Sequence, residues 1–164
     1  MKRILAISLA LIIGLSLSAQ IQNKILGFTL GKTTKSQVCK SYKKNYMFRE
    51  LSDGNCIVFD ERFAGYEWHN VQFSFYKGIL YKVRLEDHNQ YDNKTTWESL
   101  KKSLNKKYGK YFISEIKEDE ITDAIFYSDD KTALKLSSNV FMTTLQYIDI
   151  EIAKQKIDDE ESEL

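Results

Sequence analysis

The chain has 164 residues, with no proline, two cysteines, and 24 Lys and Arg against 23 Asp and Glu. A formal net charge of +1 creates no strong positive field, so nucleic acid and anionic lipid are not expected partners. This length is sufficient for one domain with a hydrophobic core.

Residues 1–19 have the order of a secretory signal peptide. Lys2 and Arg3 precede an apolar run from Ile4 to Leu17, and small residues follow as far as Ala19. The run is short for a bilayer span, which favours cleavage after Ala19 over a retained N-terminal anchor. We therefore expect an exported protein, periplasmic or secreted, with no stable membrane anchor after cleavage.

An internal repeat follows. The segments KTTKSQVCKSYKKNY (32–46) and KTTWESLKKSLNKKY (94–108) align without a gap, and Val38 matches Leu100 on one apolar helical face. Each segment also contains a threonine followed three residues later by Gln or Glu, the pattern of an N-terminal capping box. These pairs are Thr34 with Gln37 and Thr95 with Glu98. The repeat predicts two amphipathic helices.

Strand-like segments follow each predicted helix, at 57–59, 71–76 and 79–86 in the first half and at 121–128, 132–136 and 140–152 in the second. The pattern predicts an α+β fold: duplicated helix–three-strand units, about 25–88 and 89–152, forming an antiparallel sheet with two helices on one face. A single domain over 20–156 is expected. Residues 157–164 are rich in Asp and Glu, which predicts a disordered acidic tail.

The segment VQFSFYKGILYKV (71–83) predicts a hairpin with a three-residue loop over 76–78. This loop places Phe73 opposite Tyr81 and Val71 opposite Val83, so that the apolar side chains share one face. The aromatic residues of this hairpin are therefore expected in the core.

Three further aromatic residues, Phe63, Tyr66 and Trp68, precede the alternating run, in a segment made irregular by Ala64 and Gly65. Exposed Trp and Tyr side chains are frequent anchors for protein partners, and these three are the candidate binding residues. The alternative is that they fold beneath the sheet edge as a small separate apolar cluster.

The two cysteines, Cys39 and Cys56, allow two interpretations. An even number of cysteines in an exported protein favours a disulfide, whereas Cys39 beside Val38 also fits a small buried thiol. The chain has only two histidines, His69 and His88, and no paired His or Cys/His quartet. No metal site and no cofactor are therefore expected.

Catalytic motifs are equally sparse, since the chain contains no G-x-S-x-G sequence to present an activated serine. Carboxylates such as Glu61, Glu67 and Glu86 are the candidates for a pair that could hydrolyse a glycan. The expectation is that the protein is not an enzyme.

The segment ILGFTLGKTTKSQV (25–38) combines a strand ending in Leu-Gly, a threonine cap and a helix, and antiparallel strands follow it. It resembles small exported bacterial α+β domains of the outer-membrane lipoprotein SmpA/OmlA type and of the β-lactamase-inhibitor-protein type, in which such units are duplicated. The hairpin VQFSFYKGILYKV also resembles uncharacterised exported proteins of anaerobic gut bacteria. The resemblance implies a non-catalytic interaction module of the bacterial envelope.

Three functions remain open on these grounds. The leading interpretation is an exported, non-catalytic binding module with a protein partner in the envelope. The first alternative is a small secreted hydrolase that acts on glycans through paired carboxylates. The second is a binder of a small lipophilic ligand held between the helices and the sheet.

Overall fold

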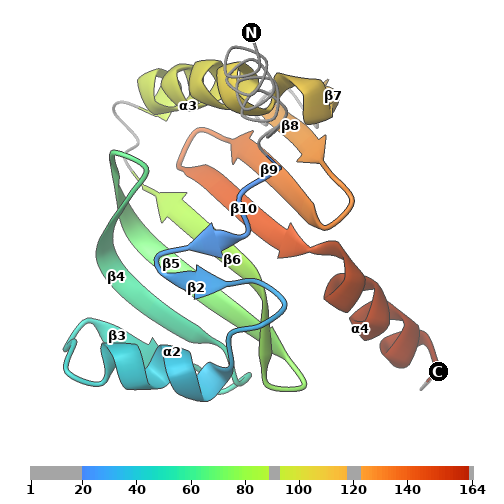
Figure 1. The fold of residues 1–164 in the computed structure, drawn as a ribbon. Helices are drawn as coiled ribbons and strands as arrows, with labels where there is room; N and C mark the ends of the chain where they lie inside the picture. The colour runs from blue at the N-terminus through green and yellow to red at the C-terminus, as the bar shows by residue number, and fades with distance from the viewer. Residues whose placement is uncertain (1–19, 89–92, 118–122, 163–164) are drawn as a thin grey trace, which may run out of the picture.

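The computed structural model describes residues 20–88, 93–117 and 123–162 (Figure 1). The elements, in chain order, are strands β1 (Lys24–Ile25) and β2 (Phe28–Thr29), helix α2 (Lys35–Tyr42), strands β3 (Phe48–Glu50), β4 (Cys56–Phe63), β5 (Tyr66–Tyr76) and β6 (Ile79–Asp87), helix α3 (Asn93–Tyr108), the 3₁₀ turn η1 (Gly109–Tyr111), strands β7 (Phe112–Lys117), β8 (Asp123–Ser128), β9 (Thr132–Ser138) and β10 (Thr143–Asp149), and helix α4 (Ile150–Ser162).

Eight of these strands form one antiparallel sheet in the order β3-β4-β5-β6-β10-β9-β8-β7. The mixed α+β class with an antiparallel sheet is therefore confirmed. Four strands follow α2 and four follow α3, whereas three were predicted after each helix. The additional strands are β3 and β7, which form the two edges of the sheet.

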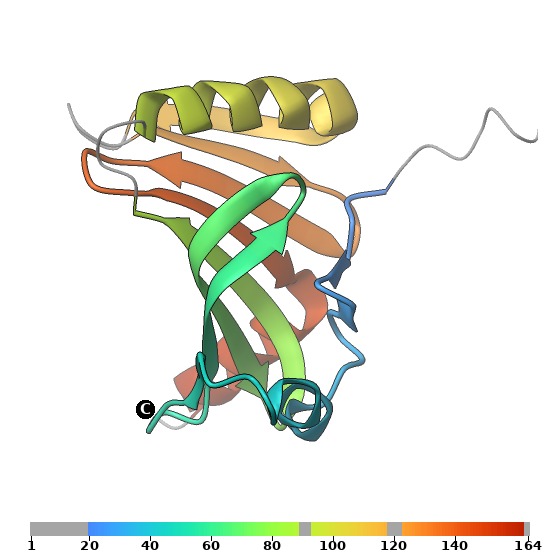
Figure 2. The same cartoon turned by 90° about the vertical axis from the view of Figure 1, so that its left-hand side faces the viewer.

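The helices lie at different places around the sheet. Helix α2 begins with the predicted capping box, in which Thr34 and Gln37 bond to each other's backbone N–H. Helix α3 crosses the end of the sheet formed by the second half of the chain, whereas α2 lies at the opposite end (Figure 2). Of the helices in the described ranges, none has the length and apolar character needed to cross a bilayer.

The core is one cluster of apolar side chains against the sheet. Val71 and Phe73 of β5 are fully buried, and the predicted helix positions Val38, Leu100 and Leu104 belong to the same cluster. The prediction that Val38 and Leu100 point inward is confirmed. Full burial of a side chain of this kind contributes about 1.5–3 kcal/mol to the free energy of unfolding.

The β5–β6 hairpin has a shorter loop than the sequence predicts. Tyr76 pairs with Ile79, so the loop contains only two residues, and both have positive φ, 47° and 80°. Such a turn matches the right-handed twist of the strands. A register shift between Ser74 and Phe75 then sets Phe73 opposite Val83 instead of Tyr81. The predicted pairing is wrong. Val71, Phe73 and Val83 are buried as expected, but near the turn Leu80 is buried in place of Tyr81, which is only partly buried.

Helix α4 occupies a region where the sequence predicts a strand over 140–152 and then a disordered acidic tail. The strand ends at Asp149, whose Oδ1 accepts a hydrogen bond from the backbone N–H of Ile152 at 3.0 Å. Asp159 lies further along α4, and its Oδ2 is 2.6 Å from Nζ of Lys77 in the β5–β6 turn. This ion pair joins the helix to the turn. The structure therefore has a helix up to Ser162, where a disordered tail was expected from residue 157, and these contacts support the helix.

Two glycines allow a test of the contact between the loop that follows β2 and the end of β10. Gly31 and Gly54 both have a left-handed backbone, but a Cβ on Gly31 would lie 2.5 Å from Asp149 Oδ2, whereas a Cβ on Gly54 would meet nothing within 4 Å. We expect Gly54→Ala to lower the free energy of unfolding by about 1 kcal/mol through backbone strain. Gly31→Ala should lower it by about 2 kcal/mol or more, because Asp149 must also move. Urea denaturation measures both losses of free energy. Equal losses for the two variants would contradict the close approach of Gly31 to Asp149.

Candidate functional site

The candidate binding residues Phe63, Tyr66 and Trp68 do lie together, at the tip of the β4–β5 hairpin, but they face inward. Trp68 is only 1% exposed, and its Nε1 donates a hydrogen bond to the backbone oxygen of Phe63 at 3.1 Å. The Tyr66 hydroxyl lies 2.8 Å from Ser99 Oγ in α3, and the Phe63 ring lies 6.1 Å from that of Tyr147. Trp68 belongs to the main core cluster, and Phe63 and Tyr66 are partly buried against it. The exposure of Trp68 considered above is therefore wrong, and the three residues do not form a separate cluster either.

An irregularity in β4 explains why Trp68 is inside. Strict alternation along β5 would place Trp68 on the face opposite Val71, yet both are buried. In the β4–β5 pairing, Phe59 is opposite Asn70 and Glu61 is opposite Trp68. Asp60, between Phe59 and Glu61, has φ of 56°. The register is the same on both sides of Asp60, so no residue is inserted, and the left-handed residue marks the place where the buried face changes in both strands. Sequence alternation alone does not reveal such a position, because Asp60 is not a glycine.

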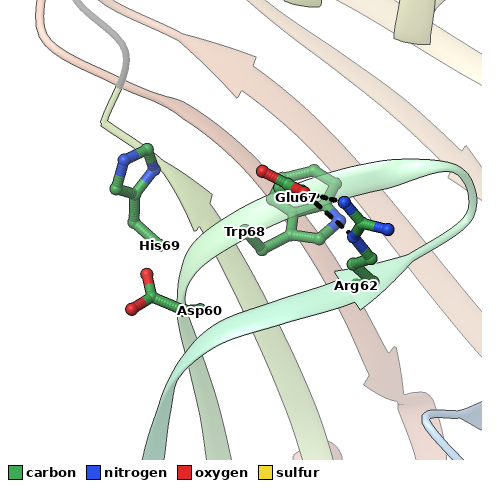
Figure 3. A pocket seen from close by; sticks show the side chains of 5 residues that line it. All are labelled: Asp60, Arg62, Glu67, Trp68 and His69. Carbon is green, nitrogen blue, oxygen red and sulfur yellow. Dashed lines mark hydrogen bonds and ion pairs between the residues drawn. The ribbon is translucent and has the colours of Figure 1, made fainter.

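An open pocket of about 220 Å³ lies on the outside of this hairpin, lined by Asp60, Arg62, Glu67, Trp68 and His69 (Figure 3). Arg62 Nε donates to Glu67 Oε1 at 2.9 Å, and both side chains are largely exposed. The hydrogen bond from Arg62 lowers the pKa of Glu67. Arg62 and Glu67 thus already bond to each other in solvent, and an exposed ion pair of this kind contributes little free energy.

The two histidines of the chain meet beside this pocket, which the sequence did not indicate. The rings of His69 and His88 lie 5.9 Å apart, and Glu86 Oε2 is 3.1 Å from His88 Nε2. Nδ1 of His69 lies 3.1 Å from Asp87 Oδ1 and 3.3 Å from the backbone N of His88. This nitrogen bonds to Asp87 only when it carries a proton, and accepts from His88 only when it does not. Asp87 also accepts a hydrogen bond from Thr96 Oγ1 at 3.3 Å.

The carboxylates considered for glycan hydrolysis lie in separate surroundings. In the β4–β5 pairing, Glu61 is opposite Trp68 and Arg62 is opposite Glu67. Because neighbouring strand residues point to opposite faces, Glu61 and Glu67 project from opposite sides of the hairpin. Burial raises the pKa of Glu61, next to the Tyr42 hydroxyl. The geometry gives these two residues no shared site.

The two cysteines meet where α2 lies over β4. Their Sγ atoms are 3.7 Å apart, and both are free thiols. Burial, followed by the contact with Cys39, raises the pKa of the Cys56 thiol to about 12. A neutral, buried thiol is a poor nucleophile. The expected pair is thus brought together, and the disulfide between Cys39 and Cys56 stays a prediction.

An apolar groove of about 390 Å³ is lined by residues of β7, β8, β9 and β10, so that it begins at edge strand β7, and we call it the β7 groove. Its apolar lining comes from Ile113, Ile116, Phe126, Ala133 and Ile148. Ile113 and Ile116 are 62% and 45% exposed, which is unusual for large aliphatic side chains in a strand. The sequence predicts no strand over 112–117, because the apolar and polar residues of FISEIK do not alternate, and this surface could not be expected from it.

Comparison of the chain with protein-family models, curated proteins and solved structures found no match. The resemblance to exported bacterial domains of the SmpA/OmlA type and of the β-lactamase-inhibitor-protein type stays an interpretation of the sequence.

Truncation of Trp68 distinguishes a core residue from a binding residue. We expect Trp68→Ala to lower the free energy of unfolding by about 3–5 kcal/mol, because it removes a large buried side chain. Arg62→Ala, on the same hairpin but with a side chain that is 82% exposed, should cost less than about 0.5 kcal/mol. Urea denaturation followed by tryptophan fluorescence and circular dichroism measures both. A Trp68→Ala variant with nearly native stability would show that the indole is not part of the core.

Proposed function

We propose that the protein is an exported, non-catalytic binding module of the bacterial envelope, which takes up an extended segment of a partner protein along β7. The partner segment would add a ninth strand to the sheet, and its apolar side chains would enter the β7 groove. In this mode of recognition the backbone hydrogen bonds provide affinity, and the pockets for alternate side chains provide specificity. The observation that carries the proposal is an apolar groove that begins at β7, a strand with no partner on its outer side within the described residues.

The two edges of the sheet differ in a way that supports this role for β7. Edge strand β3 has only three residues, and two of them, Arg49 and Glu50, are charged and exposed. Short and charged edges are the usual protection against unwanted strand pairing. Strand β7 has six residues and includes exposed Ile113 and Ile116. An edge of this kind is a hazard for a soluble protein unless a partner covers it.

A duplicated architecture makes this difference more informative. We interpret the chain as two units, α2–β3–β4–β5–β6 and α3–β7–β8–β9–β10, each with a helix on one face of its strands. The matching order of elements and the adjacency of β6 and β10 support it. In both units an ion pair joins the helix to its edge strand, Lys35 with Glu50 at 3.1 Å and Lys101 with Glu115 at 2.6 Å. If the two edges are equivalent, only one of them has acquired an apolar surface.

The two alternatives receive less support from the geometry. Hydrolysis of a glycan would need two carboxyl groups in one concave site, and Glu61 and Glu67 project from opposite faces of their hairpin. A lipophilic ligand between helices and sheet would have to displace Val38, Leu100 and Leu104, which are 0–7% exposed in one continuous cluster.

A charge placed in the β7 groove tests the proposal. We expect Ile116→Lys to weaken capture of the partner from the native envelope at least tenfold, because binding would bury the new ammonium group in an apolar groove. Val140→Lys is the matched control, since Val140 is 54% exposed but lies in the turn between β9 and β10. In the recovered complex, hydrogen exchange should show that the backbone amides of β7 are protected relative to the free protein.

Three results would contradict the proposal. One is capture that Ile116→Lys does not weaken, and another is exchange at β7 that the partner does not change. The third is a dimer of the purified wild-type protein, measured by light scattering, that Ile116→Lys dissociates. That last result would assign the groove to a second copy of this chain rather than to another protein.

A further inference from the structure

The geometry points to a binding site for a thiophilic divalent metal ion of the zinc class, formed by Cys39, Cys56 and Glu50. One ligand atom from each of these residues, the two Sγ atoms and a carboxylate oxygen, lies within 4.8 Å of the other two. The site is separate from the β7 groove and does not depend on the proposed binding function.

Three elements bring the ligands together. Cys39 lies on α2, one helical turn after Lys35, so that both side chains share a face of the helix. Glu50 of β3 is paired directly with Cys56 of β4, and directly opposed residues in an antiparallel pair have neighbouring side chains. The cluster therefore rests on a helix and a strand pair, rather than on a loop.

The distance between the sulfur atoms fits a shared metal ion. Two thiolates bound to one tetrahedral zinc at about 2.3 Å each lie about 3.8 Å apart. Sγ of Cys39 and Sγ of Cys56 are 3.7 Å apart. A disulfide requires a separation of about 2.05 Å, so the sulfur atoms would have to approach each other much further.

Charge balance also favours a divalent ion. Two thiolates and one carboxylate carry three negative charges, and a bound divalent ion reduces the net charge of the site to −1. Lys35 Nζ lies 3.1 Å from Glu50 Oε2 and supplies the remaining positive charge. Each cysteine would release its thiol proton to solvent as its sulfur–metal bond forms.

The chemistry of the donors selects the metal class. Thiolate ligands favour zinc and similar ions over magnesium and calcium, which prefer oxygen. Cys56 is fully buried, whereas the Glu50 side chain is 55% exposed, so the ion can enter from the side of β3. Water from that side completes a coordination of four.

Titration of the purified, phosphine-reduced protein with Co²⁺ under inert gas tests the site. We expect one Co²⁺ per chain, with a thiolate-to-cobalt charge-transfer band and the intense visible bands of a tetrahedral complex. Zn²⁺ should displace the cobalt and bleach these bands. The melting temperature of the protein should rise by several degrees with saturating Zn²⁺, because the ion joins α2 to the β3–β4 pair.

Substitutions identify the ligands. We expect Cys39→Ser and Cys56→Ser each to abolish the charge-transfer band, and Glu50→Gln to weaken Zn²⁺ binding about tenfold or more. Glu98→Gln, an exposed carboxylate on α3, is the matched control and should leave the affinity unchanged. Circular dichroism establishes that each variant is folded. Cys39→Ser and Glu50→Gln keep the test decisive if Cys56→Ser does not fold, because both alter side chains outside the fully buried core.

Three outcomes would overturn the proposal. The reduced protein could give no thiolate-to-cobalt band, or the band could persist in both folded cysteine variants. Protein recovered from its native compartment could also show an intact mass lacking the two thiol hydrogens. That mass would establish a Cys39–Cys56 disulfide in place of the metal.

Discussion

The pairing of β6 with β10 is the interaction on which the rest of the structure depends. These strands are the last of each half of the chain, and they alone join the two four-stranded halves of the sheet. Leu85 is opposite Leu145 and Val83 is opposite Tyr147, so that apolar side chains of both halves continue one buried surface. A slip of one residue would turn every one of these side chains toward the other face, and the apolar cluster therefore sets the register.

This central pairing determines what lies at the periphery. A sheet whose halves meet through their last strands has the first strand of each half at an edge, and these are β3 and β7. Each edge is tied to the helix that precedes it by an ion pair, through Glu50 in one half and Glu115 in the other. The surfaces with the clearest chemical character each include an edge strand: the cluster of Cys39, Glu50 and Cys56 includes β3, and the β7 groove extends from β7 inward to β10.

Much of the fold could be predicted where alternation or helical periodicity is strong. Val38 and Leu100 mark their helices, and the alternating residues of β5 and β6 mark the central strands, because burial on one face leaves a regular pattern. Strand β3 is too short for such a pattern, and α4 depends on contacts with distant residues, such as Lys77 with Asp159. Trp68 was misplaced because the buried face changes in both β4 and β5 near Asp60, whose left-handed backbone the sequence does not reveal.

The candidate sites were harder to predict than the fold for a related reason. Cys39, Glu50 and Cys56 are separated by 11 and 6 positions, which corresponds to no short metal-binding motif. Their proximity arises from the packing of α2 on β4 and from the register that places Glu50 opposite Cys56. In the gapless alignment of the two helical segments, Cys39 corresponds to Lys101, which bonds to Glu115. Lys101 thus joins α3 to edge strand β7, whereas the aligned Cys39 contacts Cys56 of the inner strand β4, and α2 is joined to its edge strand β3 by Lys35 and Glu50 instead. The aligned helix positions therefore carry different chemistry, and the edge strands of the two halves differ as well, since β3 exposes Arg49 and Glu50 whereas β7 exposes Ile113 and Ile116.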